Sequence, residues 1–343
     1  MGVDLSDIIQ RKNIKLEDLR GKVIAIDAYN ALYQYLAAIR QQDGKPLMNR
    51  FGEVTSHLSG LFYRTVNLLE NGIKPVYVFD GKPPELKYKE LERRSKLKEE
   101  AEKQYQQALE MGEIEEARTY AQRAIRLTDR MVNDAIKLLS YMGIPCVISP
   151  SEGEAQAAYI AKKGDAWATA SQDYDSLLYA TPRLVRNLTI SGKRKVPRMD
   201  AYVEISPELI SLDEVLNSLK ITQEQLIDIA ILIGTDYNPE GFERIGPKTA
   251  LSLIKKYNNL KQVLKSLNIE YKEEYDKIRE IFMNPQVTNN YKLEWNPPDE
   301  KKIIDFLTIE KDFSEERVKN ALERIKHTFI YKKSQSGLDA WFS

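Results

Sequence analysis

Aspartates stand at the ends of two short apolar runs in this 343-residue chain. The runs Val23–Asp27 and Val76–Asp80 consist mainly of β-branched and aromatic residues, which is typical of buried parallel strands. The carboxyl ends of parallel strands meet at one edge of a sheet, where ligands bind. A lone aspartate in that place is usually a turn residue or a helix cap, but several acids at one edge predict a functional site.

More acids follow two later predicted strands and one later turn. The candidate metal ligands are therefore seven carboxylates: Asp27, Asp80, Glu152, Glu154, Asp173, Asp175 and Asp236. Gathered in one pocket without compensating cations, several of them would have to stay protonated. An oxygen-only ligand set favours Mg²⁺ or Mn²⁺, and a pair of such ions is the usual arrangement for phosphodiester hydrolysis. We expect two Mg²⁺ ions, for which Mn²⁺ can substitute.

Two of these acids have an alternative role. Ser151 and Glu154 have the spacing of a capping box, in which the Glu154 carboxylate would accept a hydrogen bond from the Ser151 amide. Asp236 follows a predicted helix in the segment Gly234–Tyr237, where a turn role explains it equally well. Glu152 has no such alternative.

Two cations follow the second predicted strand. Lys87 and Arg94 are seven residues apart and share one face of a predicted helix, so both could point at a phosphate. The alternative is that they form only surface ion pairs, for which Lys87 and Glu90 have suitable spacing. The candidate catalytic residues are Lys87, Arg94, Asp80 and Glu152.

The predicted elements place these residues on an α/β fold. Residues with helical periodicity lie between the first two strands, and the alternation of strands and helices resumes over residues 145–175. We expect a central, mostly parallel twisted sheet covered by helices. The charged segment 84–130, interrupted at Met111–Gly112, is predicted to be a helical insertion with little apolar stripe. After about Ser206 the chain is expected to be mainly helical.

A glycine turn opens a basic helix at residues 241–250. Pro247 would occupy the first helical turn after Gly246, as in a helix-hairpin-helix element whose backbone amides receive a DNA phosphate. A plain helix start explains the glycine and the proline equally well. It explains less readily the basic residues of this segment, which are Arg244, Lys248, Lys255 and Lys256.

The charge of the chain is balanced in total but unevenly distributed. There are 51 basic and 51 acidic residues, whereas nucleic-acid-binding domains are usually basic. Three segments are nevertheless rich in Lys and Arg and poor in acids: 82–98, 183–198 and 244–265. Any one of them could be a solvated surface, but three together favour contact with a polyanion.

Composition also excludes several classes of protein. The single cysteine, Cys146, excludes an internal disulfide and a thiolate zinc site. No apolar run approaches the roughly 20 residues of a membrane span, and the N-terminus lacks the features of an export signal. We therefore expect a cytoplasmic protein without a membrane partner.

Five linked segments resemble the motifs of the flap endonuclease family of structure-specific 5′ nucleases. Their order and spacing agree over essentially the whole chain, and they are Ile26–Asn30, Val78–Pro84, Ser151–Ala155, Ser171–Asp175 and Gly234–Tyr237. The resemblance implies a PIN-like nuclease core with a helical arch and a helix-hairpin-helix element near 227–255. A single nuclease domain would span 1–333, divided at about 1–83, 84–130, 131–255 and 256–333, and a flexible tail would span 334–343. The abundance of Lys and Glu is typical of an archaeal, thermophilic member.

The resemblance also implies an activity. The protein would hydrolyse phosphodiester bonds near the single-strand/double-strand junction of 5′ flaps, with 5′–3′ exonuclease activity, in Okazaki-fragment maturation and long-patch base excision repair. It would act on branched DNA as a monomer and use Mg²⁺, with K⁺ bound at the helix-hairpin-helix element. The implied DNA contacts are Gly2, Tyr33, Arg64, Gly234, Gly246, Lys248 and Thr249. Tyr33 would stack on a nucleobase, although core packing explains it as well.

The C-terminal residues resemble a sliding-clamp-binding motif. After a polar stretch the chain carries a glutamine, an aliphatic residue and two aromatics: Gln335, Leu338, Trp341 and Phe342. Exposed aromatics of this kind need a partner, and the resemblance names the sliding clamp PCNA. The alternative is that they pack back on the protein's own surface.

Two other functions fit parts of the pattern. A metal-dependent phosphatase or kinase would need a glycine-rich phosphate loop or an Asp-x-Asp nucleophile after the first strand, and the sequence has neither. A non-catalytic DNA-junction scaffold tethered to the clamp would keep the basic segments and the tail. Such a scaffold would not require seven carboxylates.

Overall fold

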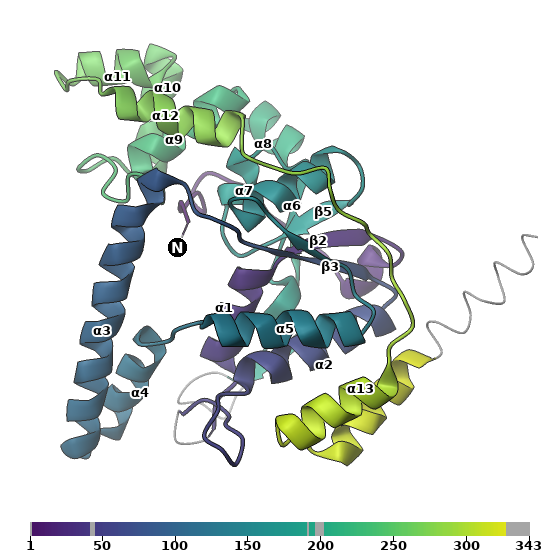
Figure 1. Ribbon diagram of the computed structural model, residues 1–343. Coiled ribbons are helices and arrows are strands. Elements are labelled where there is room, and N and C mark those ends of the chain that lie inside the picture. The colour runs from purple at the N-terminus through teal and green to yellow at the C-terminus, as the bar shows by residue number, and fades with distance from the viewer. Residues whose placement is uncertain (1, 42–44, 191, 196–201, 327–343) are drawn as a thin grey trace, which may run out of the picture.

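The computed structural model describes residues 2–41, 45–190, 192–195 and 202–326. At its centre is a seven-stranded sheet with the order β1-β9-β6-β5-β2-β3-β4 (Figure 1). Its strands are β1 (Lys12–Asn13), β2 (Val23–Asp27), β3 (Lys74–Phe79), β4 (Cys146–Ile148), β5 (Ala168–Ala170), β6 (Arg183–Arg186) and β9 (Glu208–Ser211). The five strands from β6 to β4 run parallel, whereas β9 is antiparallel to both β6 and β1. The expectation of a mostly parallel sheet is therefore confirmed.

Helices cover both faces of this sheet. They are α1 (Ala28–Ala38), α2 (Ser56–Glu70), α3 (Tyr88–Glu110), α4 (Ile114–Arg123), α5 (Asp129–Tyr141), α6 (Gly153–Lys162), α7 (Asp175–Leu178), α8 (Leu212–Leu219), α9 (Gln223–Ile233), α10 (Pro247–Tyr257), α11 (Leu260–Ser266), α12 (Glu273–Met283) and α13 (Glu300–Ile304). Short 3-10 turns lie at η1 (Leu16–Leu19), η2 (Glu85–Lys87) and η3 (Leu188–Ile190), a π-helical turn, η4, at Asp305–Glu310, and a further helix at 315–326. A separate hairpin is formed by β7 (Gly192–Lys195) and β8 (Tyr202–Ile205).

The two faces of the sheet bury alternate residues of the same strands. Ile24 and Ile26 of β2 pack with Tyr77 of β3 in a cluster that includes residues of α1, α2 and α5. Ala25 and Val78 point to the opposite face, where they pack with α6. Because both faces are covered, these strands are apolar throughout rather than alternating, and their polar residues appear only where each strand ends.

The helical insertion stands apart from this core. In Figure 1 α3 and α4 project away from the sheet on one side, and α10, α11 and α12 gather above the beginning of α3. Of the 23 residues of α3, only Glu90, Ala101 and Ala108 are buried, and the helix packs mainly against α4. The expected break lies between the end of α3 at Glu110 and the start of α4 at Ile114.

The region after Ser206 is mainly helical, as expected, and its described part contains one strand, β9, which extends the sheet beside β6. The strands β1, β6, β7, β8 and β9 were not predicted from the sequence. In the described part of the chain, no helix combines the length and the apolar character needed to cross a bilayer.

Candidate active site

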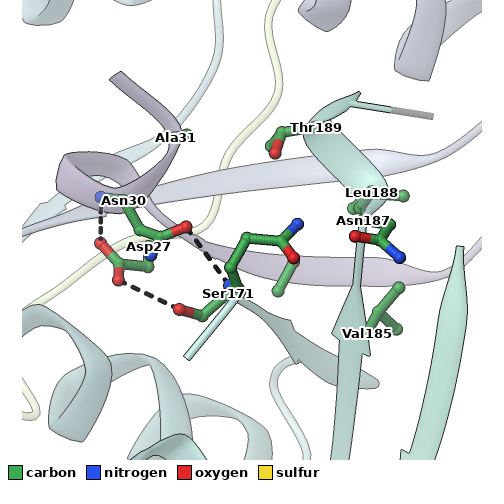
Figure 2. Close-up of a pocket in the computed structure, with 10 residues that line it drawn as sticks. Asp27, Asn30, Ala31, Ser171, Val185, Asn187, Leu188 and Thr189 are labelled. Atoms are coloured by element: carbon green, nitrogen blue, oxygen red, sulfur yellow. Dashed lines mark hydrogen bonds between the residues drawn. The ribbon is translucent and has the colours of Figure 1, made fainter. Parts of the chain in front are cut away.

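The end of β2 carries Asp27, which has two roles. Its side chain caps α1 by accepting a hydrogen bond from the Asn30 amide at 3.0 Å. Its other carboxylate oxygen lies 3.3 Å from the hydroxyl of Ser171, at the end of the neighbouring strand β5 (Figure 2). The helix-cap explanation is therefore correct for this residue, but it does not exclude a site, because the capping carboxylate faces the next strand end.

The end of β3 brings Asp80 against the start of α6. Asp80 Oδ1 accepts a hydrogen bond from the Gly153 amide at 2.7 Å, and a Cβ atom on Gly153 would come within 2.6 Å of that oxygen. Glycine is therefore needed for this close approach. Glu152 is the N-cap of α6 but makes no side-chain capping bond, which leaves its carboxylate available to other partners.

The capping-box role considered for Glu154 is wrong. Helix α6 starts at Gly153 after Glu152, so Ser151 is not its N-cap, and the Ser151 amide donates to the hydroxyl of Ser149 instead. Glu154 Oε1 accepts a hydrogen bond from Ser171 Oγ at 2.8 Å. One hydroxyl group thus lies between the carboxylates of Glu154 and Asp27.

The loop after β5 supplies Asp173 and Asp175. Asp173 Oδ2 accepts a hydrogen bond from the side-chain amide of Asn30 at 3.1 Å. Asp175 begins α7, and its Oδ1 accepts from the Val3 amide at 2.7 Å. A Cβ atom on Gly2 would lie 2.5 Å from the same oxygen, so the N-terminal segment reaches the site as the resemblance implied.

Asp236 reaches the same region from the turn after α9. The turn itself is held by Thr235 and Asn238, whose side chains are hydrogen bonded to each other at 2.7 Å. Asp236 instead pairs with Arg94 and, at 3.2 Å, with Lys87. The turn role considered for Asp236 belongs to its neighbours.

The seven carboxylates share one electrostatic environment. Burial raises the pKa of Asp27 to about 8, with Asp80 and Asp173 contributing. Burial likewise raises the pKa of Asp80 to about 6, with Glu152 as the next cause, and that of Asp175 to about 7, with Asp236 as the next cause. The pKa of Glu154 is raised well above its usual value, again by burial first and then by its acidic neighbours. The predicted cluster is therefore real as an arrangement of acids.

Two cations from the base of α3 enter this acidic pocket. Lys87 Nζ lies 2.5 Å from Glu152 Oε2 and also contacts Asp236. Burial acts to lower the pKa of Lys87, but these two carboxylates outweigh it, so the pKa is raised and the ammonium stays charged. Arg94 contacts Asp236 and is held at 2.6 Å by the buried carboxylate of Glu90. The surface-pair alternative is wrong for Lys87 and only partly right for Arg94.

The donor set fits divalent cations. Within the described residues, no three of the acids are grouped closely enough to enclose an ion as they stand. Two of the acids, Glu152 and Asp236, are paired with Lys87 and Arg94. Burial first, and then neighbouring carboxylates, raise the pKa values of Asp27, Asp80, Glu154 and Asp175 even with these two cations present. Oxygen donors with excess negative charge suit Mg²⁺ or Mn²⁺. The acids of the pocket are the residues that would hold such ions.

Tyr33 lies in α1 on the side facing the insertion. It is only partly buried, and Lys98 of α3 lies over its ring with Nζ 4.7 Å from the centroid and 3.2 Å from the hydroxyl. Core packing, the alternative considered for Tyr33, is therefore not its role. Arg64 of α2 is also partly buried, and a Cβ on Gly192 would lie 3.9 Å from its Nη1.

The predicted helix-hairpin-helix element is formed by α9, a glycine turn and α10. Gly246 is the N-cap of α10 and Pro247 its first residue. Gly241 has a φ of 55°, and a Cβ there would lie 2.2 Å from the carbonyl oxygen of Ile233, so the turn requires glycine. Lys248 and Thr249 occupy the first turn of α10, with Lys248 largely exposed, and Gly234 ends α9.

Comparison with known proteins identifies the family. The chain matches the XPG N-terminal domain over residues 1–101 and the XPG I-region over residues 143–236. It is 59% identical over 350 residues to flap endonuclease 1 of Staphylothermus marinus, with 100% of both chains covered. It is 60% identical over 342 residues to flap endonuclease 1 of Pyrococcus abyssi, covering 100% of this chain and 98% of the relative. The chain belongs to the flap endonuclease 1 family.

A solved flap endonuclease structure agrees with this assignment. Flap endonuclease-1 from Methanococcus jannaschii superposes with a TM-score of 0.77 at 49% identity, covering 96% of this chain and 100% of that one. The resemblance to flap endonucleases is thereby confirmed. The alternative of a non-catalytic scaffold gains no support, because these relatives are named as endonucleases.

Several residues around the flap endonuclease site were not predicted from the sequence. Asn30 contacts Asp27 and Asp173, and Ser171 lies between Asp27 and Glu154. Arg186 donates to the carbonyl of Gln172 at 3.0 Å and to the hydroxyl of Tyr174 at 2.8 Å, on either side of Asp173. The spacing of Asn30 and Asp27, three residues apart at a helix start, was a usable signal; the sequence holds no comparable signal for Arg186.

The residues predicted to bind the sliding clamp lie outside the described residues, and they are Gln335, Leu338, Trp341 and Phe342.

Proposed function

We propose that the protein is a structure-specific 5′ flap endonuclease that hydrolyses phosphodiester bonds near the junction of single- and double-stranded DNA. The observation that carries this proposal is the grouping of seven carboxylates with two cations at the carboxyl edge of the sheet, at the base of a projecting helix. Membership of the flap endonuclease 1 family supports the same substrate. A 5′–3′ exonuclease activity, and roles in Okazaki-fragment maturation and long-patch base excision repair, belong to this proposal.

The proposed cofactors are two Mg²⁺ ions, with Mn²⁺ able to substitute. The residues that would hold them are Asp27, Asp80, Glu152, Glu154, Asp173, Asp175 and Asp236. When bound, the ions would lower the pKa of bound water and stabilise charge on the phosphate. The raised pKa values of the buried acids mean that binding must release protons.

Lys87 and Arg94 are the proposed phosphate-contacting cations. In the structure both pair with acids of the pocket, so each already stands within one side-chain length of the reacting centre. A phosphate in the pocket would take over some of their hydrogen bonds, and their charge would stabilise the negative charge that develops on its oxygens. This contribution is electrostatic and needs no proton transfer by either residue.

The proposed DNA path leaves the pocket in two directions. A flap strand would pass between α3 and the core, where Tyr33 offers a ring for base stacking beside Lys98. Duplex DNA would rest on the start of α10, whose free amides at Gly246, Lys248 and Thr249 can receive a phosphate, with K⁺ shared between carbonyls and that phosphate. Unpairing the nucleotides next to the cut costs a few kcal/mol, which contacts with the arch would offset.

The domain arrangement and the partners complete the proposal. A single nuclease domain would span residues 1–333, and residues 334–343 would bind the sliding clamp PCNA. The two large buried clusters of the described residues, one around α1, α2 and α5 and one around α7 to α12, are consistent with one continuous nuclease unit. We propose that it acts as a monomer.

The test is cleavage of three matched substrates that share one labelled strand. The strand is presented as a 5′ flap, as a nicked duplex and as a fully single-stranded oligonucleotide, each with Mg²⁺ and with EDTA. We expect efficient Mg²⁺-dependent cutting of the flap near the junction, weaker cutting of the nicked duplex and little cutting of the single strand. Equal cutting of all three substrates would contradict the proposed specificity.

A further inference from the structure

A chain of polar side chains leads from the acidic pocket to η3, away from the reacting centre. Figure 2 shows its inner end, where Asn30 lies between Asp27 and the end of β5. The Asn30 backbone amide donates to Asp27, and its side-chain amide donates to Asp173 at 3.1 Å. One residue thus contacts two proposed metal ligands that come from different strands.

The orientation of the Asn30 amide is fixed by its other contacts. Its side-chain oxygen accepts hydrogen bonds from the side-chain amide of Gln34 and, at 3.3 Å, from the backbone amide of Gln172. Two donors on this oxygen leave the NH₂ group to face Asp173. A reversed amide would place NH₂ against two donors and a carbonyl oxygen against a carboxylate.

The same argument applies to Gln34 one helical turn further along α1. Its side-chain oxygen accepts the hydroxyl proton of Thr189 at 2.7 Å, so its NH₂ group faces Asn30. Thr189 is buried, with 5% of its surface exposed, and lies in η3, which directly precedes the β7–β8 hairpin. Every donor in the series Thr189, Gln34, Asn30 therefore points toward Asp173.

We propose that Asn30 is a positioning residue of the metal site and that Gln34 and Thr189 fix its orientation. The proposal rests on the function proposed above, because it assumes that Asp27 and Asp173 bind divalent cations. An N–H donor on each carboxylate holds one oxygen in place and favours the ionised form, which leaves the other oxygen oriented for a ligand. In this proposal the three side chains act through the two acids that Asn30 contacts.

The simpler explanation is that the network only satisfies buried polar groups. Such a role would affect folding stability but not the concentration of Mg²⁺ that the protein requires. A metal titration therefore distinguishes the two explanations, and it does so without a cleavage assay.

The experiment compares Asn30→Met, Thr189→Val and Thr189→Ser with the wild-type protein. Asn30→Met keeps a side chain of similar length without donors, Thr189→Val removes one hydroxyl at nearly constant shape, and Thr189→Ser retains it. The matched control is Thr65→Val in α2, which removes a buried hydrogen bond to Tyr77 of β3, outside the site. The first readout is the Mg²⁺ concentration that gives half of the metal-dependent rise in melting temperature. The second is the Mg²⁺ dependence of kcat and KM on a flap substrate.

We expect Asn30→Met to raise the half-point for Mg²⁺ by about 10-fold or more, as is usual for residues that orient metal ligands. Thr189→Val should raise it by a smaller factor, and Thr189→Ser should restore it. The double variant Asn30→Met/Thr189→Val should have the same half-point for Mg²⁺ as Asn30→Met alone, because Thr189 acts only through Asn30. The control should lower the melting temperature without moving the half-point, and KM for DNA at saturating Mg²⁺ should change little in every variant.

The inference is overturned if Asn30→Met and Thr189→Val lower the melting temperature but leave the half-point for Mg²⁺ unchanged. It is also overturned if Mg²⁺ does not stabilise the wild-type protein at all. Failure of the proposed function looks different: the wild-type protein would not cut flaps, while its stabilisation by Mg²⁺ still depended on Asn30. That result would leave the positioning role intact.

Discussion

The acidic pocket and the helical arch contribute to one site but are held in opposite ways. In the pocket Asp27, Glu152 and Asp175 are each less than 10% exposed, and most of the acids accept a hydrogen bond from a neighbouring element. The arch helix α3 buries only three of its residues. The proposed chemistry thus lies at buried strand ends, and the proposed substrate contact lies on a helix with few buried residues, which is a feature of segments that open easily.

Lys87 and Arg94 connect these two regions. They belong to the beginning of the arch, yet their partners Glu152 and Asp236 belong to the pocket. In the absence of DNA, the pocket therefore helps to hold the base of the arch in place. The comparison predicts that pocket variants will lose catalysis, whereas arch variants will lose a mixture of catalysis, substrate ordering and local stability.

The largest effect is expected for Asp173→Ala. Removing a carboxylate proposed to bind metal should lower kcat for flap cleavage on the order of 10³-fold or more, while binding of branched DNA stays within a few-fold of wild type. Single-turnover cleavage and a gel-shift assay measure the two quantities. Loss of binding in parallel with cleavage would mean that the pocket does not act separately from the DNA-binding surfaces.

Lys87→Ala should have the next largest effect. Loss of a cation that stabilises charge only during reaction is expected to lower kcat by about 100-fold with little change in KM. The nearby exposed residue Lys89 provides a matched control, since Lys89→Ala removes the same charge from the start of α3. Equal defects in both variants would show that the net charge of the helix matters rather than contact with the pocket.

The metal-free protein should become less stable as pH rises from about 6 to 8. Asp27, Asp80 and Asp175 have folded-state pKa values of about 8, 6 and 7, raised from the ordinary value of 3.8. Over that range the folded state therefore binds more protons than the unfolded state, and stability falls with rising pH by up to about 1.4 kcal/mol per unit for each protonated group.

Melting temperatures in EDTA at pH 6, 7 and 8 measure this slope. Asp27→Asn should flatten it, and Mg²⁺ should reverse it, because metal binding requires ionised carboxylates. His57 opposes this slope only at its lower end: burial lowers its pKa to about 4, so its contribution to stability is lost as pH falls below about 6.5. The interval from pH 7 to pH 8 therefore reports the acids. A metal-free protein whose stability rises between pH 6 and 8 would contradict the electrostatic account of the pocket.

A smaller effect is expected at Tyr33, where the arch meets the core. Tyr33→Ala should weaken flap cleavage by about 10-fold, the range of one lost base-stacking contact, whereas Tyr33→Phe keeps the ring and should stay near wild type. Steady-state kinetics on one flap substrate suffices. If Tyr33→Phe were as defective as Tyr33→Ala, the hydroxyl contact with Lys98 would matter more than the ring.

The smallest effect is expected from deletion of residues 335–343. Cutting of a bare flap should be unchanged, and only stimulation by the sliding clamp should be lost. The measurement is the cleavage rate with and without the clamp. A fall in basal activity would assign the tail to the nuclease unit itself.

The sequence predicted the pocket better than its surroundings. Val23–Asp27 was predicted as a strand with the bounds that it has, because a buried parallel strand is a continuous apolar run that ends abruptly in polar residues. The two-residue edge strand β1 and the antiparallel β9 carry no such run, since short edge strands are set by their neighbours. For Ser151 and Glu154 the error is of the opposite kind. Their spacing matches a capping box, but the box does not form because α6 begins one residue later than that pattern requires.

The residues that contact the acids and Tyr33 could mostly not be predicted from the sequence. Arg186 reaches the Asp173 loop from the next strand, β6, and Lys98 reaches Tyr33 across 65 residues. Such contacts depend on the tertiary arrangement, and neither the residue type nor the spacing in the sequence predicts them. The acids were found because seven of them converge on strand ends and turns, whereas each supporting residue acts alone.

The most direct test of the central claim uses a preassembled complex of Asp80→Ala with a 5′ flap substrate. The complex is formed without divalent metal, its occupancy is measured, and Mg²⁺ is then added beside a wild-type complex of equal occupancy. The account predicts that the wild-type complex cuts near the junction within the first turnover, while the variant stays bound and uncut. Cleavage by the variant at a near wild-type rate would contradict the assignment of the carboxylate pocket as the metal-dependent catalytic centre.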